Sequence, residues 1–226
     1  MKLEDAIEFA ENAEPRCACV LLLDTSGSMS GAPIAELNRG MALFRDHLSG
    51  DSLASRRVEI AVVTFDNEAR LVQDFVTADQ FFPPTLTAPG IATSMGAGIQ
   101  LALDLVQSRK AMYRANGITY YRPWIFLITD GAPTESESEI ERAAQRIRED
   151  ENSKRVSFFA VGVEGANMET LKSISVKEPV KLTGLNFRDM FVWLSASLQR
   201  VSASKITPAG VQEQVPLQPL GWGSAV

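Results

Sequence analysis

Four short apolar segments alternate with longer segments whose apolar residues recur at helical spacing. The apolar segments are residues 17–24, 58–65, 122–129 and 156–163. Each is rich in β-branched or aromatic residues and is apolar on successive positions, as expected of strands that are covered on both faces. Such strands are typical of a parallel sheet that lies between two layers of helices. The pattern therefore predicts an α/β fold.

The segments between the strands predict five helices. In the first, apolar residues three and four positions apart form one face of a helix that begins near Pro33 and ends near Gly50: Ile34, Leu37, Met41, Phe44 and Leu48. We expect the other helices at about 96–113, from Thr134 onward, at about 167–175 and at about 188–202. The helix near Thr134 is predicted from a capping box formed by Thr134 and Glu137.

Two weaker strands complete the predicted sheet. Residues 69–75 follow the second apolar segment so closely that a short hairpin through 66–68 should join them, which predicts an antiparallel edge strand. A further strand is expected near 180–183. The predicted fold is a doubly wound, mostly parallel six-stranded sheet with one antiparallel edge strand and helices on both faces.

The C-terminal segment differs in composition from the rest of the chain. Its prolines and glycines preclude a helix, and its apolar side chains, Trp222 among them, would be costly to leave in water. We expect residues 1–206 to form a single domain and residues 207–226 to form an extended strap packed on it. The alternative is that 207–226 is a free peptide that binds a partner.

Composition and charge exclude several classes of function. The chain has 226 residues, of which 45% are hydrophobic, and its 22 basic and 28 acidic residues give a net charge of −6. The basic residues form no stripe along the sequence, so we expect no nucleic-acid binding. The apolar segments are far shorter than the roughly 20 residues of a membrane helix. The first ten residues include three acids, Glu4, Asp5 and Glu8, where a signal peptide carries bases, so we expect a cytoplasmic protein.

Oxygen-bearing side chains follow the first apolar segment. Asp24 stands at its end, and Ser26 and Ser28 follow at alternate positions of a turn that contains Gly27. Oxygens placed in this way can converge on one hard cation. A turn of this composition is also a common helix N-cap, so the pattern by itself leaves both interpretations open.

Two other loops supply further oxygens. Asp130 follows the third apolar segment, and in a doubly wound sheet the first and third segments lie side by side, so Asp24 and Asp130 should approach each other. Two neighbouring carboxylates repel each other, and a bound divalent cation commonly offsets this repulsion. Thr93, in the loop 89–96 before the second helix, could complete a face made from three loops.

The five residues together resemble a known metal site. Asp24-x-Ser26-x-Ser28, with Thr93 and Asp130, is similar to the metal-ion-dependent adhesion site of von Willebrand factor A (VWA) domains, whose fold is the doubly wound sheet predicted above. Three stretches are similar to bacterial tellurium-resistance VWA proteins of the TerY type: residues 22–29, 120–134 and 158–163. The similarity extends from about residue 16 to Trp222. It departs at Ala92, where that group usually has glycine before the threonine.

The resemblance implies a role for each residue. Ser26 and Ser28 would bind Mg²⁺, or alternatively Mn²⁺ or Ca²⁺, directly, and Asp24 and Asp130 would act largely through bound water. Thr93 would bind directly or through water. Because the direct ligands are neutral, the ion would still attract an anionic oxygen, which in the family comes from a Glu or Asp of a partner protein.

The resemblance also implies a biological setting. It predicts a non-enzymatic, metal-dependent protein-binding module of a bacterial tellurium-resistance or stress-response system, acting alongside kinase and phosphatase partners. The alternative is a metal-dependent phosphohydrolase that uses the same crevice, but the motifs contain no histidine, lysine or second carboxylate as acid or base. The histidine of the chain, His47, is expected on a solvated helix face. A third possibility is an inactive site, with partners bound by the helices or the strap.

Overall fold

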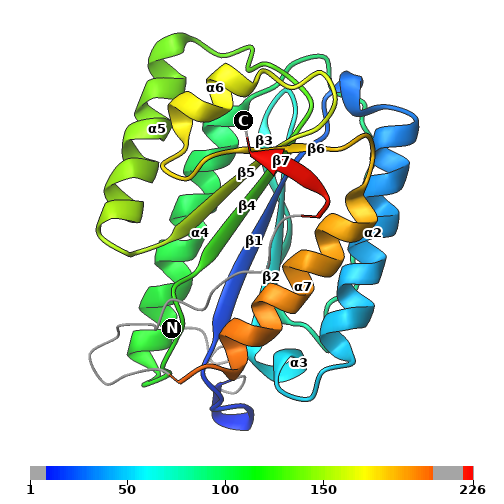
Figure 1. Cartoon of the computed structure of the whole chain (residues 1–226). Coiled ribbons are helices and arrows are strands. Elements are labelled where there is room, and N and C mark those ends of the chain that lie inside the picture. The colour runs from blue at the N-terminus through cyan, green and yellow to red at the C-terminus, as the bar shows by residue number, and fades with distance from the viewer. Residues whose placement is uncertain (1–8, 206–220, 226) are drawn as a thin grey trace.

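The computed structural model describes residues 9–205 and 221–225, and a seven-stranded sheet in the order β3-β2-β1-β4-β5-β6-β7 lies at the centre of this part of the chain (Figure 1). The strands are β1 (Cys17–Asp24), β2 (Val58–Phe65), β3 (Ala69–Thr77), β4 (Trp124–Thr129), β5 (Ser157–Gly162), β6 (Val180–Leu182) and β7 (Gly223–Ala225). Five neighbouring strands are parallel, in the order β2, β1, β4, β5 and β6. Strand β3 pairs antiparallel with β2. The mostly parallel sheet and its antiparallel edge are therefore confirmed.

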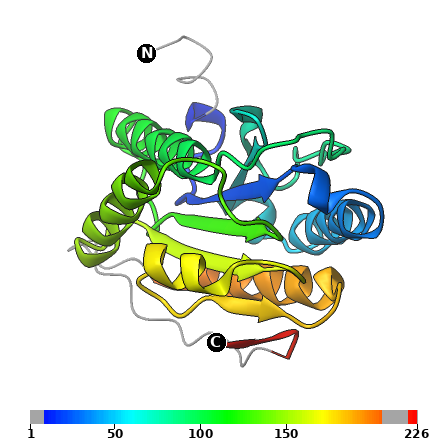
Figure 2. The ribbon, with the colours of Figure 1, turned by 90° about the horizontal axis from the view of Figure 1, so that it is seen from above.

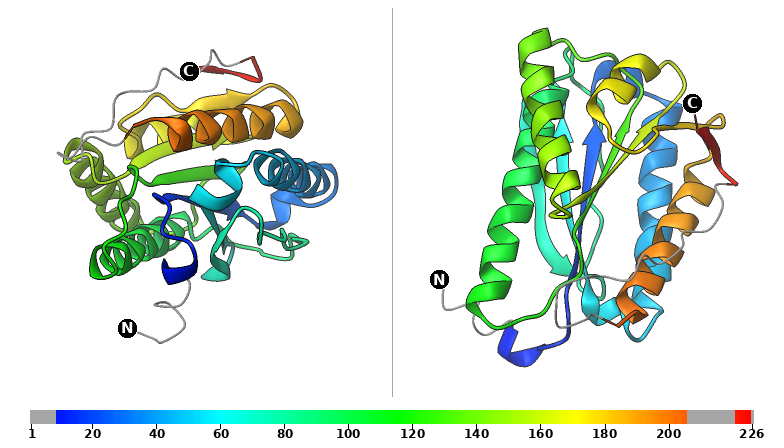
Figure 3. Two further views of the ribbon diagram at one scale, coloured as in Figure 1. Left: turned by 90° about the horizontal axis from the view of Figure 1, so that it is seen from below. Right: turned by 60° about the vertical axis from the view of Figure 1, so that its left-hand side comes forward.

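The predicted number of strands was wrong by one. The additional strand, β7, pairs antiparallel with β6 and forms the second edge of the sheet. Its sequence, Gly-Ser-Ala, has neither β-branched residues nor an alternating pattern, so it is a strand only because β6 offers unpaired backbone groups. Figure 3 shows β7 at the outer edge of the domain, beside the C-terminus.

Helices cover both faces of the sheet, as predicted (Figure 2). They are η1 (Gly27–Met29), α2 (Ala32–Ser49), α3 (Ala54–Arg57), α4 (Met95–Ala115), α5 (Glu137–Asn152), α6 (Met168–Ile174) and α7 (Phe187–Ala203). One core lies between the sheet and α2, α3 and α7, and the other lies between the sheet and α4, α5 and α6. The short helix α3 was not predicted from the sequence.

Strand β1 shows why the central strands are apolar throughout. Cys17 and Leu21 belong to the core under α2 and α7, whereas Val20 and Leu22 belong to the core under α4. Successive side chains of a strand point to opposite faces, so a strand between two helix layers has no polar face. Within the described part of the chain, no helix combines the length and the apolar character that crossing a membrane requires.

The capping box predicted for α5 was wrong. Glu137 is the first helical residue, Ser136 is the N-cap, and the Ser136 N–H donates to Glu139 Oε2 over 2.9 Å. Thr134 is used elsewhere, because its Oγ1 accepts a hydrogen bond from the Thr93 N–H. The loop before α5 is therefore bonded to the loop before α4, 41 residues away in sequence. A local sequence motif does not reveal such a contact.

The described end of the predicted strap is packed on the domain. Trp222 is 2% exposed, and its ring lies 5.6 Å from that of Trp193 on α7 in an edge-to-face arrangement. Its carbonyl accepts a hydrogen bond from the Thr183 N–H over 3.1 Å. The rest of the strap, from 207 to 220, lies outside the described residues, and so does residue 206 at the predicted domain boundary.

Candidate functional site

The candidate site lies where β1 and β4 end, at the upper edge of the sheet in Figure 1. Asp24 is the last residue of β1, and Asp130 directly follows β4. The two strands pair in parallel, with Leu23 opposite Ile128, so their carboxyl ends meet at the same edge. The fold thus brings Asp24 and Asp130 to neighbouring positions, as the doubly wound order predicted.

A chain of hydrogen bonds joins the two aspartates. The Ser26 N–H donates to Asp24 Oδ1 over 2.8 Å, which closes the turn after β1. Ser26 Oγ lies 3.0 Å from Ser28 Oγ, and the Ser28 hydroxyl donates to Asp130 Oδ1 over 2.7 Å. The two serines therefore face the same space as the two carboxylates.

Thr93 reaches the same space from the loop before α4. A Cβ at Gly131 would lie 3.3 Å from Thr93 Oγ1 and 3.5 Å from Asp24 Oδ2. Gly131, next to Asp130, is thus in contact distance of both side chains. The structure brings all five predicted residues together from three loops.

Backbone contacts fix the loop that carries Thr93. The side chain Oδ1 of Asn67 accepts hydrogen bonds from the N–H groups of Ile91 and Ala92, each over 3.0 Å. Gly90 pairs with Ser26, and a Cβ on Gly90 would lie only 2.3 Å from the Asp66 Cβ, so this position admits no side chain without a shift. Ala92, at the position where the similar proteins usually have glycine, is half-buried, and Asn67 holds its backbone N–H.

Thr129 is a site residue that the sequence analysis missed. Its hydroxyl donates to Asp24 Oδ2 over 2.5 Å and accepts a hydrogen bond from the Gly131 N–H over 3.2 Å. It thereby fixes the Asp24 carboxylate on the side opposite Ser26. Its position at the end of a buried strand, next to Asp130, was the signal that could have revealed it.

Asp66 was also missed, although it follows β2 as Asp24 follows β1. It is buried, and its Oδ2 accepts a hydrogen bond from the Thr25 hydroxyl over 3.1 Å. Unlike the two site aspartates it has a cationic partner, because Arg70 lies 3.1 Å from its Oδ1. Residues 66–68 were interpreted as a hairpin turn. The contact of the Asp66 carboxylate with Thr25, in the loop after β1, was therefore missed.

The two site carboxylates are buried without a cationic side chain. Asp24 is 0% exposed and Asp130 is 7% exposed, and no salt bridge among the described residues includes either. Burial raises the pKa of Asp24, and the hydrogen bonds from Ser26 and Thr129 oppose that rise. Burial likewise raises the pKa of Asp130, the Ser28 hydrogen bond opposes the rise, and the charge of Asp24 adds to it. An added cation would favour both charged forms.

The donor set fits a hard divalent cation. Two carboxylates and three hydroxyls supply only oxygen, which Mg²⁺ and Ca²⁺ prefer, and neither imidazole nor thiolate is among them. In the described ranges, no cluster of three or more His, Cys, Asp or Glu could hold a metal, so any ion here depends on the hydroxyls.

His47 does not belong to this site. Its Nδ1 lies 3.3 Å from Ser195 Oγ on α7, and its carbonyl accepts a hydrogen bond from the Gln199 side chain. The ring is half-buried between α2 and α7, not on a solvated face as predicted. Its role is to join these two helices.

A protein-family model described as "von Willebrand factor type A domain" matches residues 19–190. The matched segment contains all five candidate residues together with Asp66 and Thr129. No curated protein matches the chain in sequence.

Solved structures share the fold at low sequence identity. A von Willebrand factor type A protein from Catenulispora acidiphila has a TM-score of 0.64 at 18% identity, over 82% of this chain and 43% of that one. The pilus adhesin SpaC from Lactobacillus rhamnosus GG has a TM-score of 0.64 at 12% identity, over 84% of this chain and 31% of that one. The vWF domain of the type V pili tip protein Mfa5 from Porphyromonas gingivalis has a TM-score of 0.60 at 14% identity, over 82% of this chain and 95% of that one. The chain thus spans less than half the length of the first two.

Proposed function

This chain belongs to the von Willebrand factor type A family, and we propose that it binds a protein partner through a divalent cation held by Asp24, Ser26, Ser28, Thr93 and Asp130. VWA domains are interaction modules. The observation that carries the proposal is the hydrogen-bonded chain from Asp24 through the two serines to Asp130. It gathers hydroxyl and carboxylate oxygens from distant loops around two buried negative charges.

The side chains are already oriented for this role. The Ser28 hydroxyl donates its proton to Asp130, so Ser26 is the donor to Ser28, and one lone pair of Ser28 Oγ remains for a cation. Asp24 is held by the Ser26 N–H on one oxygen and by the Thr129 hydroxyl on the other, so its carboxylate is positioned before any ion arrives. When bound, Mg²⁺ would supply a Lewis-acidic centre that accepts one more anionic oxygen. A Glu or Asp of the partner is the oxygen donor we propose.

The surface beside the site supports a protein partner. Ile91, two positions before Thr93, is 93% exposed although it is a large apolar residue. Its backbone N–H is fixed by Asn67, so the side chain is presented by an anchored loop. In a complex, the side chain of Ile91 would add an apolar contact to the partner beside the contact made through the ion.

We further propose a setting for this activity. The resemblance of residues 22–29, 120–134 and 158–163 to TerY-type proteins supports a partner from a bacterial tellurium-resistance or stress-response system, with kinases and phosphatases as candidates. The same setting supports a cytoplasmic location. We propose binding without catalysis because VWA domains are typically interaction modules.

Thermal denaturation with and without metal tests the cation. We expect Mg²⁺ or Mn²⁺ to raise the melting temperature of the metal-free protein, since a ligand that binds only the folded state stabilises it by RT ln(1 + [L]/Kd), about 2.7 kcal/mol at 100 times Kd. Asp24→Ala should abolish the rise, and Asp79→Ala, which removes an exposed carboxylate elsewhere, should retain it. An unchanged melting temperature of the wild type at millimolar metal would contradict the proposal.

A further inference from the structure

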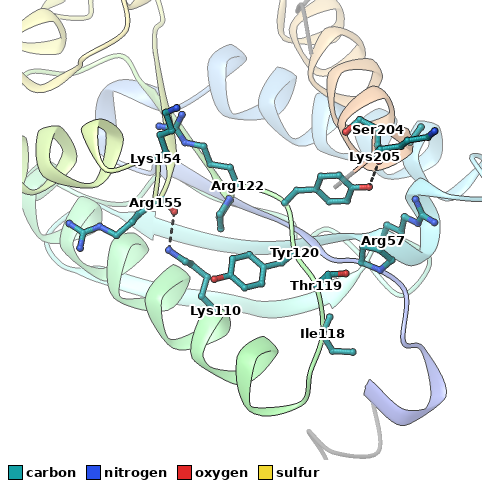
Figure 4. A pocket seen from close by; sticks show the side chains of 14 residues that line it. Arg57, Lys110, Ile118, Thr119, Tyr120, Arg122, Lys154, Arg155, Ser204 and Lys205 are labelled. Atoms are coloured by element: carbon teal, nitrogen blue, oxygen red, sulfur yellow. Dashed lines mark hydrogen bonds between the residues drawn. The ribbon is translucent and has the colours of Figure 1, made fainter. Parts of the chain in front are cut away.

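A second candidate site lies at the opposite end of the sheet from Asp24 and Asp130. It is a pocket of about 990 Å³ whose lining residues precede β1, β4 and β5 or end α3, α4 and α7 (Figure 4). Six of these residues are basic, and none is acidic, although acids outnumber bases in the chain. The basic residues are Arg57, Lys110, Arg122, Lys154, Arg155 and Lys205.

The three arginines are held in place by carboxylates. Each makes an ion pair, at distances of 2.7, 3.1 and 2.8 Å respectively: Arg57 with Glu14, Arg122 with Glu151 and Arg155 with Asp150. These pairs fix the guanidinium groups at the pocket and compensate most of their charge. The three lysines therefore account for the net positive charge of the lining.

Lys110 is the most informative of these lysines. It is 5% exposed, its ammonium donates to the Arg155 carbonyl over 3.1 Å, and no ion pair of the described residues includes it. Burial lowers the pKa of Lys110, and the nearby charges of Arg114 and Arg155 lower it further, while Asp150 opposes them. An ammonium has three donors, so a buried one with a single carbonyl acceptor is incompletely satisfied. An anion in the pocket would satisfy it.

Lys154 presents a second ammonium at the rim. It is exposed, and its φ of 55° makes it the one non-glycine residue with positive φ in the described part of the chain. Glycine adopts this conformation more easily than lysine does. The turn between α5 and β5 therefore carries a cationic side chain at a position where the backbone alone would favour glycine.

We propose that this basic pocket binds a phosphorylated small molecule of about nucleotide size. The volume is in the range of known ligand pockets, roughly 300–1,000 Å³. Lysine ammonium groups are common phosphate ligands. Ile118 and the half-buried ring of Tyr120, which line the same pocket, offer a wall for the part of the ligand that carries no charge.

The burial of Lys110 in the pocket lining favours a small ligand over a polymer or a membrane. Figure 4 shows Lys110 within the lining while Lys154 and Lys205 lie on different sides of the pocket. Because Lys110 is almost completely buried, a flat anionic surface would meet only the exposed lysines and arginines. A phosphate group that enters the pocket can approach Lys110 and the rim together.

Isothermal titration calorimetry with ADP tests the proposal. The buffer contains EDTA and little salt, so that the metal site takes no part and the charges are not screened. We expect ADP to bind the wild type, pyrophosphate to bind more weakly and adenosine to give no heat. Lys110→Met should weaken ADP binding tenfold or more, because methionine fills a similar volume without the charge. Lys172→Ala, which removes an exposed lysine on α6, should leave it unchanged.

A second variant distinguishes a loss of ADP binding from a loss of folding. Lys154→Gly relieves the strained φ, so we expect it to be at least as stable as the wild type in thermal denaturation and yet to bind ADP several times more weakly. Asp24→Ala should bind ADP as the wild type does, which separates this pocket from the metal site. No heat with ADP or pyrophosphate at millimolar concentration would overturn the proposal, as would equal binding by Lys110→Met, Lys154→Gly and the wild type. Binding to vesicles of anionic lipid without binding of ADP would overturn it in favour of a membrane surface.

Discussion

Ser28 and Asp130 are 102 residues apart in sequence, yet the Ser28 hydroxyl donates to Asp130 Oδ1 over 2.7 Å. The contact exists because β1 and β4, though distant in sequence, are neighbours in the sheet and run in the same direction. It joins the loop after β1 to the loop after β4 and orients a hydroxyl that a cation can use.

Removing the charge of Asp24 should stabilise the metal-free protein at neutral pH. Burial raises the pKa of Asp24, so the folded state binds this proton more tightly than the unfolded state does. The stability that this group contributes is therefore lost as pH rises through the folded-state pKa. Urea denaturation in EDTA should show Asp24→Asn to be more stable than the wild type at pH 7.

The difference should shrink as the pH falls through the folded-state pKa of Asp24, because the wild-type carboxyl then becomes protonated and loses its charge. Asp79→Asn, on an exposed residue, should show no such pH dependence. An Asp24→Asn variant that is less stable than the wild type at pH 7 would show that the carboxylate is not under electrostatic strain.

Glu139, and not Glu137, should contribute to the start of α5. The Ser136 N–H and hydroxyl both donate to Glu139 Oε2, and these hydrogen bonds lower the pKa of Glu139. Glu139→Ala should lower the melting temperature measurably, whereas Glu137→Ala should change it little. The difference should diminish below the folded-state pKa of Glu139, because the protonated group no longer accepts both hydrogen bonds well. Calorimetry of the wild type and the two variants from pH 7 down into the acid range provides the comparison.

Trp222 should anchor the described end of the C-terminal segment. It packs against Trp193 and is 2% exposed. Trp222→Ala should destabilise the protein by about 3–5 kcal/mol, the range for truncation of a large buried aromatic. Gly221→Ala is the control, because no atom outside its immediate neighbours lies within 4 Å of a Cβ at that position. Urea midpoints that agree between Trp222→Ala and the wild type would show that the packing of Trp222 on Trp193 contributes nothing to stability.

Ile91 should contribute to partner binding without contributing to the metal site. The Ile91 side chain is exposed, and Ile91 is hydrogen-bonded to the Asn67 side chain only through its backbone N–H. Ile91→Ser should weaken the partner several-fold and leave the thermal shift with Mg²⁺ unchanged. Val176→Ser, a change of another exposed apolar residue, should alter neither. Loss of the metal shift in Ile91→Ser would instead mean that the substitution disturbs the Thr93 loop.

The fold and the meeting of Asp24 and Asp130 at one edge of the sheet were predictable because they follow from local patterns. Strands buried on both faces appear as continuous apolar segments, and the residues after them must meet at one edge of a parallel sheet. Asp24 and Asp130 were found in this way. Asp66 meets the same criterion and was overlooked, because a hairpin turn also explained it.

Other features depend on contacts that no local pattern records. β7 is a strand through its pairing with β6, and Thr134 binds the Thr93 N–H instead of capping a helix. The pocket gathers its basic side chains from five separate segments, so the even distribution of bases along the sequence concealed it. Such features become visible only once the chain is folded.

The most direct test of the central proposal is capture of a partner with the full chain as bait, in Mg²⁺ and in EDTA. We predict a protein that the wild type retains in Mg²⁺ and releases in EDTA, and that Ser28→Ala binds several times more weakly in Mg²⁺. Ser173→Ala, which removes an exposed hydroxyl on α6, should bind this protein as the wild type does. Substitution of the partner's contacting Glu or Asp by Ala should abolish the metal dependence. Equal retention by the wild type and Ser28→Ala, in Mg²⁺ and in EDTA alike, would contradict the account.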